Sequence, residues 1–97
     1  MRVKLTAAAR NDLRAYFYHI ASENPRAADR ERKRVLTELI KFAAAPVDGP
    51  AVRVESWPRA ARCWIVHPFR VYYERVRHED IVVVFRLHHH ARRPIER

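Results

Sequence analysis

Cysteine and long hydrophobic runs are scarce in this chain, and each shortage excludes a class of protein. One cysteine among 97 residues, Cys63, cannot form an internal disulfide or a cysteine-based zinc site. The longest strongly apolar run, residues 81–85, is far shorter than the roughly 20 residues that span a membrane. The first ten residues contain no hydrophobic signal-peptide segment, so we expect a cytoplasmic protein with no membrane partner. Length and composition predict one globular domain over residues 1–97.

Acidic residues are also scarce. Twenty Lys and Arg stand against eleven Asp and Glu, which gives a net charge of +9. A field of this sign attracts polyanions and acidic proteins, so we expect an acidic partner. From Gly49 onward the chain has ten arginines and no lysine. Arginine is favoured over lysine where its planar guanidinium must contact a carboxylate or a phosphate. A GC-rich genome, which favours arginine codons, would give the same excess of arginine.

The first half of the chain predicts a strand followed by two helices. Residues 2–6 alternate apolar and basic side chains, as a strand does. Thr6 can cap a first helix, and Asn24 followed by Pro25 ends it and caps a second helix, which stops before Pro46. The apolar stripes are Ala9, Leu13, Tyr16, Phe17 and Ile20 in the first helix, and Ala28, Val35, Leu36, Leu39, Ile40 and Ala43 in the second. So short a break makes the two helices a hairpin.

The second half, after the turn around the only glycine, predicts strands. Residues 51–56 and 69–76 alternate, residues 62–67 are apolar and bulky, and residues 81–87 follow a tight turn. Short connections favour an antiparallel meander. The fold class is therefore α+β, with an N-terminal strand and a helical hairpin packed on a C-terminal antiparallel sheet. In the last strand, alternation assigns Ile81, Val83, Phe85 and Leu87 to the helices, and Val82, Val84, Arg86, His88 and His90 to the other face.

Three consecutive histidines, residues 88–90, raise the question of a metal or catalytic site. Neighbouring strand residues point to opposite faces, so only His88 and His90 converge, and we expect no metal or cofactor. Metal-free RNA cleavage needs a base, an acid and cations for the phosphorane charge. One sheet face could supply all three. The candidate catalytic residues are Arg62, Arg70, Tyr72, Arg86, His88 and His90. A solvated basic face is the favoured explanation of these residues, and metal-independent cleavage of mRNA is the alternative, so enzymatic activity stays undecided.

Two surfaces could bind a partner. Trp57 lies in loop-like sequence and is a candidate surface contact, whereas Trp64 and Tyr73 are expected to pack against the helices. The basic run at residues 29–34 and the apolar hairpin beside it could accept an acidic amphipathic segment. An ordinary solvated helix face fits this run equally.

These motifs occur in an order that resembles the RelE/ParE superfamily of bacterial toxins. The N-terminal half has a strand ending in Leu-Thr, then A-x-x-D-L, an Asn-Pro break and A-A-x-R. The distal half has PVDGP, an R-x(5–8)-R-(I/V)-x-Y strand pair and a closing R-x-x-H-x-x-R. The residues on family positions are Asp12, Leu13, Asn24, Pro25, Ala28, Arg30, Pro46, Gly49, Arg62, Arg70, Tyr73, Arg86, His89 and Arg92.

The resemblance implies the toxin of a type II toxin–antitoxin pair. Such toxins are neutralised by a cognate antitoxin whose C-terminal segment covers the helices and the sheet of the toxin. The complex of the two proteins binds operator DNA only through the antitoxin. RelE-like members cut mRNA on the ribosome, whereas ParE-like members poison DNA gyrase. The long hairpin and the absence of lysine after Lys41 favour ParE, while the histidines keep the nuclease alternative open.

The resemblance also implies contact residues. Target and antitoxin contacts fall on Trp57, Arg59, Arg86, His89, Arg92 and Arg93, and antitoxin contacts of the hairpin on Leu13, Phe17, Arg30 and Arg34. A third hypothesis, a basic module that simply holds nucleic acid, predicts salt-sensitive binding to bare RNA or DNA. No role is assigned to His88 and His90.

Overall fold

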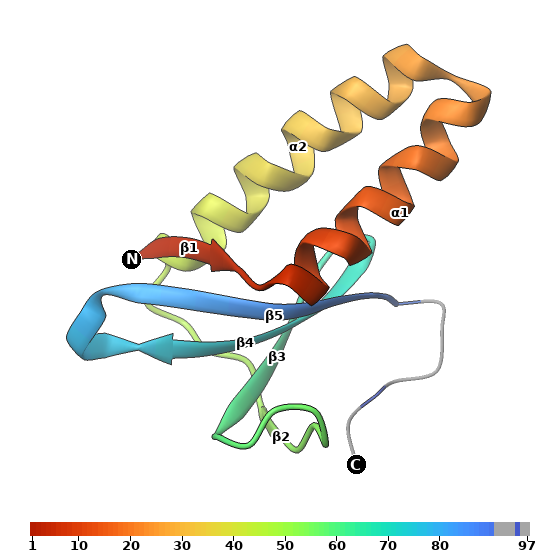
Figure 1. Ribbon diagram of the computed structural model, residues 1–97. Coiled ribbons are helices and arrows are strands. Elements are labelled where there is room, and N and C mark those ends of the chain that lie inside the picture. The colour runs from red at the N-terminus through yellow and green to blue at the C-terminus, as the bar shows by residue number, and fades with distance from the viewer. Residues whose placement is uncertain (91–94, 96–97) are drawn as a thin grey trace.

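A computed structural model describes residues 1–90 and residue 95 of the chain. Figure 1 shows a pair of helices lying on one side of a twisted sheet, with the far end of the pair projecting beyond it. The elements are β1 (Arg2–Leu5), α1 (Ala7–Glu23), α2 (Pro25–Ala44), β2 (Ala51–Val52), β3 (Ala61–Val66), β4 (Phe69–Val76), the 3-10 turn η1 (Arg77–Glu79) and β5 (Ile81–His89). The predicted α+β class and the helical hairpin are confirmed.

The helix boundaries follow the predicted caps. The Thr6 hydroxyl accepts a hydrogen bond from the N–H of Ala9 (3.2 Å), which satisfies a donor in the first turn of α1. Asn24 serves both helices, because its N–H donates to Ile20 at the end of α1 and its side chain accepts from Ala27 at the start of α2. A single residue between the helices therefore fixes the hairpin.

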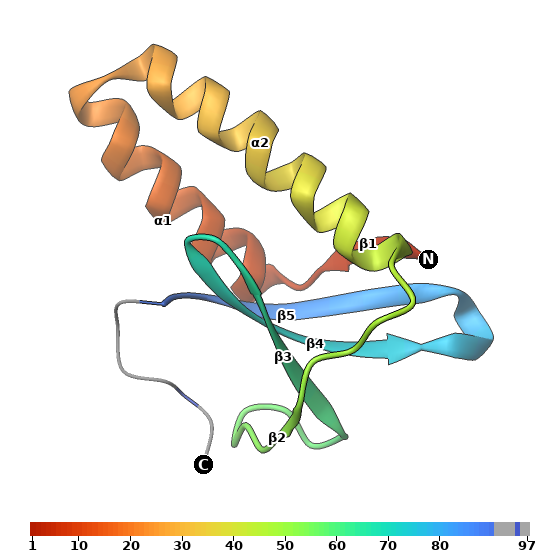
Figure 2. The same ribbon diagram turned by 180° about the vertical axis from the view of Figure 1, so that it is seen from behind.

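The sheet has the order β1-β5-β4-β3-β2. Strands β3, β4 and β5 form the predicted antiparallel meander, and β1 pairs with β5 in parallel. The predicted strand over residues 51–56 is too long, because only Ala51 and Val52 pair with β3. The chain then turns, with the N–H of Trp57 donating to Val54 (3.0 Å), and forms the loop seen beside β2 in Figure 2.

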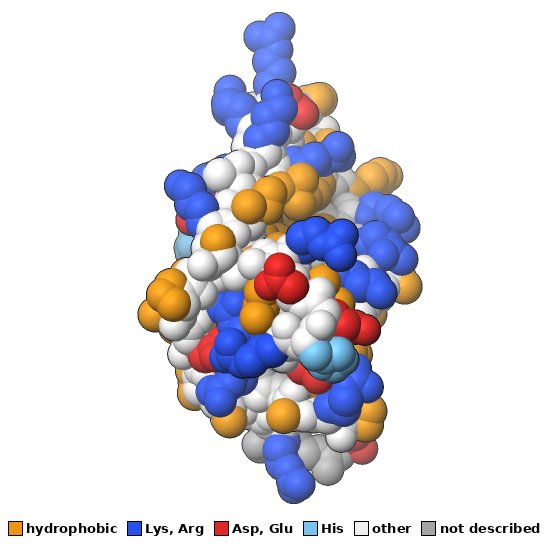
Figure 3. Space-filling view, turned by 90° about the vertical axis from the view of Figure 1, so that its left-hand side faces the viewer, with side chains coloured by type: hydrophobic (Ala, Val, Ile, Leu, Met, Phe, Trp, Pro, Cys, Tyr) orange, Lys and Arg blue, Asp and Glu red, His pale blue; other side chains and the backbone are white. Residues whose placement is uncertain are grey.

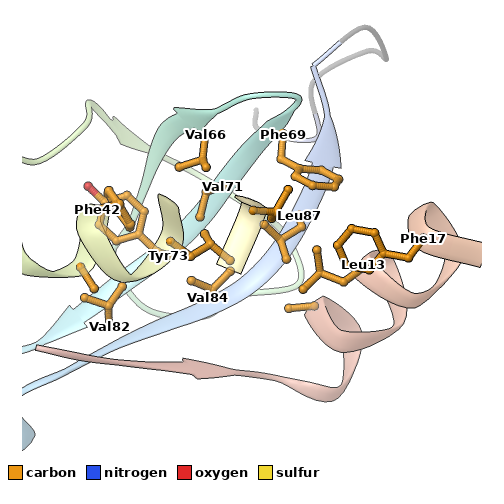
Figure 4. Close-up of a cluster of buried hydrophobic side chains, with 14 residues drawn as sticks. Leu13, Phe17, Phe42, Val66, Phe69, Val71, Tyr73, Val82, Val84 and Leu87 are labelled. Carbon is orange, nitrogen blue, oxygen red and sulfur yellow. The ribbon is translucent and has the colours of Figure 1, made fainter. Parts of the chain in front are cut away.

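The main core lies between the hairpin and the sheet, where side chains of α1, β4 and β5 converge (Figure 4). The predicted face of the first half of β5 is wrong. A register shift between Tyr72 and Tyr73 leaves an extra residue in β5, which is a β-bulge. Val82 and Val84 consequently face the helices, whereas Phe85 packs into a second cluster on the opposite face. Leu87, after the bulge, faces the helices as predicted.

The predicted stripe of α2 is also partly wrong. Leu36 and Ile40 are 39% and 64% exposed, whereas Phe42, which the prediction omitted, is 5% exposed. With about 3.6 residues per turn, Phe42 shares a line with Val35 and Leu39, and the two exposed residues lie a quarter-turn away. The apolar stripe therefore continues beyond the core onto the surface.

The segment from α2 to β2 is held by side chains of β4. The guanidinium of Arg75 donates to four backbone carbonyls at and beyond the end of α2, those of Phe42, Ala43, Ala45 and Val47, and pairs with Asp48. The Tyr73 hydroxyl accepts from the N–H of Gly49 (2.8 Å) and donates to Asp48 (3.2 Å). A Cβ on Gly49 would lie 1.7 Å from the carbonyl oxygen of Cys63, so only glycine fits there.

We expect Gly49→Ala to destabilise the protein by more than about 3 kcal/mol, because the clash is with backbone that cannot move aside. Urea unfolding followed by circular dichroism measures the effect. Pro50→Ala is the control, since the carbonyl of residue 50 can still accept from the N–H of Cys63. An unchanged unfolding midpoint in Gly49→Ala would show that the linker does not make this contact.

Candidate functional site

The candidate catalytic residues do not share one sheet face. Arg70 and His88 are cross-strand partners and lie on the face that the helices leave uncovered. Arg62, in contrast, pairs with Tyr73, whose ring is in the core under the helices. The Arg62 guanidinium donates to the carbonyl of Gly49 (2.8 Å). The expected position of Arg62 on the same face as Arg70 and His88 is therefore wrong, because the strand register places Arg62 on the helix side.

Arg86 is held by the first helix. Its Nε lies 2.8 Å and its terminal nitrogen 3.3 Å from the two carboxylate oxygens of Asp12 in α1. The same carboxylate accepts from the N–H of Leu87 (2.9 Å), next to the bulge. β1 leaves the edge of β5 at Leu5, and α1 then lies along that edge. Arg86 is thus part of a structural ion pair.

Tyr72 is unsuited to the role of a surface acid. The ring is completely buried against Phe85 in the second cluster, on the face opposite the helices. Its hydroxyl accepts a hydrogen bond from the N–H of Ile95 (3.4 Å). A proton donor for RNA must reach the leaving oxygen within hydrogen-bond distance, and this hydroxyl lies beneath other side chains.

The histidines gather at the end of the sheet. His90 lies with its Nδ1 2.8 Å from the carbonyl of Pro68, and its ring is 5.1 Å from that of His67. The ring of His89 stacks on His90 at 5.2 Å and contacts Tyr16 of α1 at 6.3 Å. Over residues 1–90 and 95, no group of three or more His, Cys, Asp or Glu is arranged to hold a metal. The proximity of His67 was not visible in the sequence.

Trp57, the candidate surface contact, is half-buried in the loop after β2. Its ring stacks on Phe85 at 4.3 Å, and its Nε1 donates to Glu74 (3.0 Å). Arg59 covers the other face of the ring at 4.5 Å and pairs with the same carboxylate (2.8 Å). Trp57 and Arg59 therefore hold the loop after β2 against the sheet. Arg92 and Arg93 lie outside the described residues.

A groove of about 690 Å³ runs between α1 and α2. Its floor is apolar and includes Leu13, Phe17, Ala28 and Leu36. Three arginines, Arg10, Arg14 and Arg32, line it as well, against one acid, Asp29. The Arg32 guanidinium lies 5.7 Å from the centre of the Phe17 ring. Figure 3 shows Lys and Arg side chains from the end of the hairpin to the sheet, with hydrophobic side chains exposed among them. The groove therefore combines an apolar floor with a cationic border.

Most of the chain also matches the model of a known protein family. Residues 3–94 match the family of the ParE toxin of the type II toxin–antitoxin system parDE. The chain belongs to this family. Comparison with curated proteins gives no significant match. A ParE-family chain is the toxin of a type II pair and has a cognate antitoxin as its partner.

The groove of this ParE-family toxin contains two of the four hairpin residues predicted to contact an antitoxin. Leu13 and Phe17 line it, whereas Arg30 and Arg34 do not. Arg34 lies on the opposite flank of α2, where it pairs with Glu31 and donates to the carbonyl of His67 (2.8 Å). Arg30 is exposed. The arginines at the groove were missed, although Arg10 and Arg14 flank the predicted stripe of α1 at helical spacing.

A hydrogen-bond chain, partly buried at Tyr16 and exposed at Arg34, joins the hairpin to the turn between β3 and β4. The Tyr16 hydroxyl donates to Glu31 (3.0 Å), and burial together with this carboxylate raises the pKa of Tyr16 to about 12. The hydrogen bond from Arg34 lowers the pKa of Glu31 below its usual value. Tyr16 therefore stays neutral and Glu31 stays charged at neutral pH.

None of the described helices is both long and apolar enough to cross a membrane.

We expect Asp12→Ala to lower the free energy of unfolding by about 2 kcal/mol, because it leaves the N–H of Leu87 and the Arg86 guanidinium without their shared acceptor. Asn11→Ala, the neighbouring exposed position, removes only a surface hydrogen bond with Arg14 and should cost less than about 0.5 kcal/mol. Equal stabilities of the two variants in urea titrations would argue that Asp12 does not anchor the bulge.

Proposed function

We propose that this ParE-family toxin acts in the cytoplasm by inhibiting DNA gyrase. The supporting observation is that the parts of a nuclease site are used for other purposes. Arg86 pairs with Asp12, Tyr72 is buried, and Arg62 lies on the helix side of the sheet. A toxin that acts by binding requires no such site.

The groove between α1 and α2 is the proposed antitoxin site. Its apolar floor suits the apolar face of an amphipathic helix, and its arginines suit acidic residues on either side of that face. The net charge of +9 adds long-range attraction for an acidic partner. Operator DNA would be contacted through the antitoxin in the resulting complex.

The alternative function, ribosome-dependent mRNA cleavage, has one observation in its favour. Arg70 and His88 are partners on the uncovered sheet face, where a cation and a base would be needed. A cleavage site built on them would have to take its remaining groups from the mRNA or the ribosome. This pair therefore provides the variant that separates the two functions.

Expression of the toxin without antitoxin in a bacterial host should induce the SOS response and leave transcripts intact. The Arg70→Ala/His88→Ala double variant should remain toxic, because a gyrase inhibitor does not use these groups for chemistry. SOS reporter activity and mapping of mRNA 5′ ends measure the two outcomes. Rapid cutting at codon boundaries, reduced about a hundredfold or more in the double variant, would establish the nuclease instead.

We expect Leu36→Asp to weaken the toxin–antitoxin complex at least about tenfold, because it places a carboxylate on the apolar floor of the groove. Thr37→Asp is the matched control, with the same new charge one residue along α2 and outside the groove. Calorimetric titration with the antitoxin compares them. Equal losses in both variants would mean that charge alone, and not the groove, governs the contact.

A further inference from the structure

Two histidines that are distant in the sequence meet at one end of the sheet. The ring centres of His67, in the turn between β3 and β4, and His90, directly after β5, are 5.1 Å apart. Both residues are exposed, so solvent and ions can reach them. We expected no metal at residues 88–90 because strand alternation separates consecutive histidines. Alternation compares residues of one strand only, and it could not show that the turn brings His67 to the same place.

The His90 ring is held in an orientation that suits a metal ligand. Its Nδ1 lies 2.8 Å from the carbonyl oxygen of Pro68, which can only accept a hydrogen bond, so Nδ1 carries the proton. The backbone N–H of His90 donates to the same oxygen (2.8 Å), and the ring of His89 stacks on the His90 ring at 5.2 Å. The lone pair of the neutral imidazole is therefore on Nε2. Metal-binding histidines commonly donate their other ring nitrogen to a carbonyl in this way.

The backbone of His67 is anchored on two sides. Its carbonyl accepts a hydrogen bond from the Arg34 guanidinium of α2 (2.8 Å). Only Pro68 separates His67 from β4, which begins at Phe69. The turn therefore holds the two imidazoles near each other without any contribution from a long loop.

The separation of the two rings fits imidazoles that share one ion. With zinc–nitrogen bonds of about 2.0–2.1 Å and tetrahedral angles, two imidazole ring centres on one ion are about 5 Å apart. The observed separation is 5.1 Å. The exposed His67 side chain can turn about its own bonds to direct a nitrogen at an ion on Nε2 of His90, and the strands need not move.

The donor atoms determine which ions fit. Imidazole nitrogen suits Zn²⁺, Ni²⁺ and Cu²⁺, whereas Mg²⁺ and Ca²⁺ prefer oxygen ligands. In the described part of the chain no third His, Cys, Asp or Glu completes a metal-binding group, and Cys63 is buried in the second cluster. Two protein ligands leave coordination positions for water. Such a site exchanges its ion more readily than a closed, four-ligand structural zinc site.

The charges around the pair do not favour cations in general. Arg34 repels a cation, and the Glu31 carboxylate attracts one. The pKa of Glu31 is lowered mainly by the hydrogen bond from Arg34 and to a smaller extent by the charge of His67, so the carboxylate lies within electrostatic reach of the pair. The net charge of +9 opposes any cation. Binding must therefore come from the imidazole nitrogens, and an ion that avoids nitrogen should not bind.

We propose that His67 and His90 form a binding site for a late first-row divalent ion, Zn²⁺, Ni²⁺ or Cu²⁺. The two imidazoles supply two ligands, and water supplies the rest. A bound ion links the β3–β4 turn to the residue that follows β5, and so stabilises this end of the sheet. The site lies outside the groove, and the proposal does not depend on whether the target is gyrase or mRNA.

Calorimetric titration of the purified toxin, freed of metal with EDTA, tests the site. ZnCl₂ should bind with one ion per chain, and MgCl₂ should not bind. His67→Gln and His90→Gln should each weaken zinc binding at least about tenfold, because each removes a ligand. His78→Gln is the matched control, since His78 is exposed in η1 at the other end of β4 and should bind as wild type. Wild-type affinity in either ligand variant, or an equal loss in the control, overturns the proposal.

Imidazole ¹⁵N chemical shifts of the wild-type toxin identify the coordinating atoms without any substitution. Addition of ZnCl₂ should shift Nε2 of His90 and one nitrogen of His67, while Nδ1 of His90 stays protonated. Shifts confined to other histidines, such as His88 or His89, overturn the pair.

Thermal unfolding gives an independent measure, because an ion that binds the folded state raises the unfolding midpoint. ZnCl₂ should raise the midpoint of the wild type, and MgCl₂ should not. The double variant His67→Gln/His90→Gln should unfold at the wild-type temperature without zinc, since both residues are exposed, and should not respond to zinc. An equal rise with zinc in the wild type and the double variant overturns the proposal.

Discussion

The placement of α2 on the sheet depends on one buried guanidinium. The Arg75 side chain is only 7% exposed, and its charge is tolerated because four carbonyl oxygens and the Asp48 carboxylate surround it. Burial alone would raise the pKa of Asp48, but the hydrogen bond and the charge of Arg75 outweigh it and hold the pKa below its usual value. The carbonyl end of a helix also favours a cation. Since the linker leads from this point to Gly49 beside β3, the C-terminal end of α2 and the linker both take their positions from Arg75.

The β-bulge in β5 is a second constraint, and it determines which side chains cover the sheet face opposite the helices. The bulge in β5 turns Phe85 toward Trp57 and returns Leu87 to the core, so each face of the sheet has its own cluster. Asp12 stabilises the bulge by binding the backbone after it and the Arg86 side chain. An arginine of β5, beyond the end of β1, thereby has a structural partner from α1. A toxin that works by occupying a protein surface can use the position in this way, whereas a nuclease needs its cation free for the phosphorane.

The local features could be predicted from the sequence, and the long-range ones could not. Thr6, Asn24 and Pro25 mark the helix ends because capping is a property of a few neighbouring residues. The bulge gave no signal, because residues 81–85 are all apolar and such a run has no alternation to reveal its phase. The ion pair of Asp12 with Arg86 joins residues 74 positions apart, and the register of the sheet decides it. The groove could be predicted only in part. Helical spacing predicted Leu13 and Phe17, but the angle between the two helices decides which arginines lie beside them.

The charge and the apolar floor of the groove have separate kinetic consequences for the proposed antitoxin complex. The positive field would attract an acidic antitoxin before contact, so changes in the bordering arginines should act mainly on the association rate and depend on salt. The apolar floor would act after contact, and changes there should act mainly on the dissociation rate. Under the proposed function, the arginines therefore control how fast the toxin is neutralised, and the apolar floor controls how long it stays neutralised.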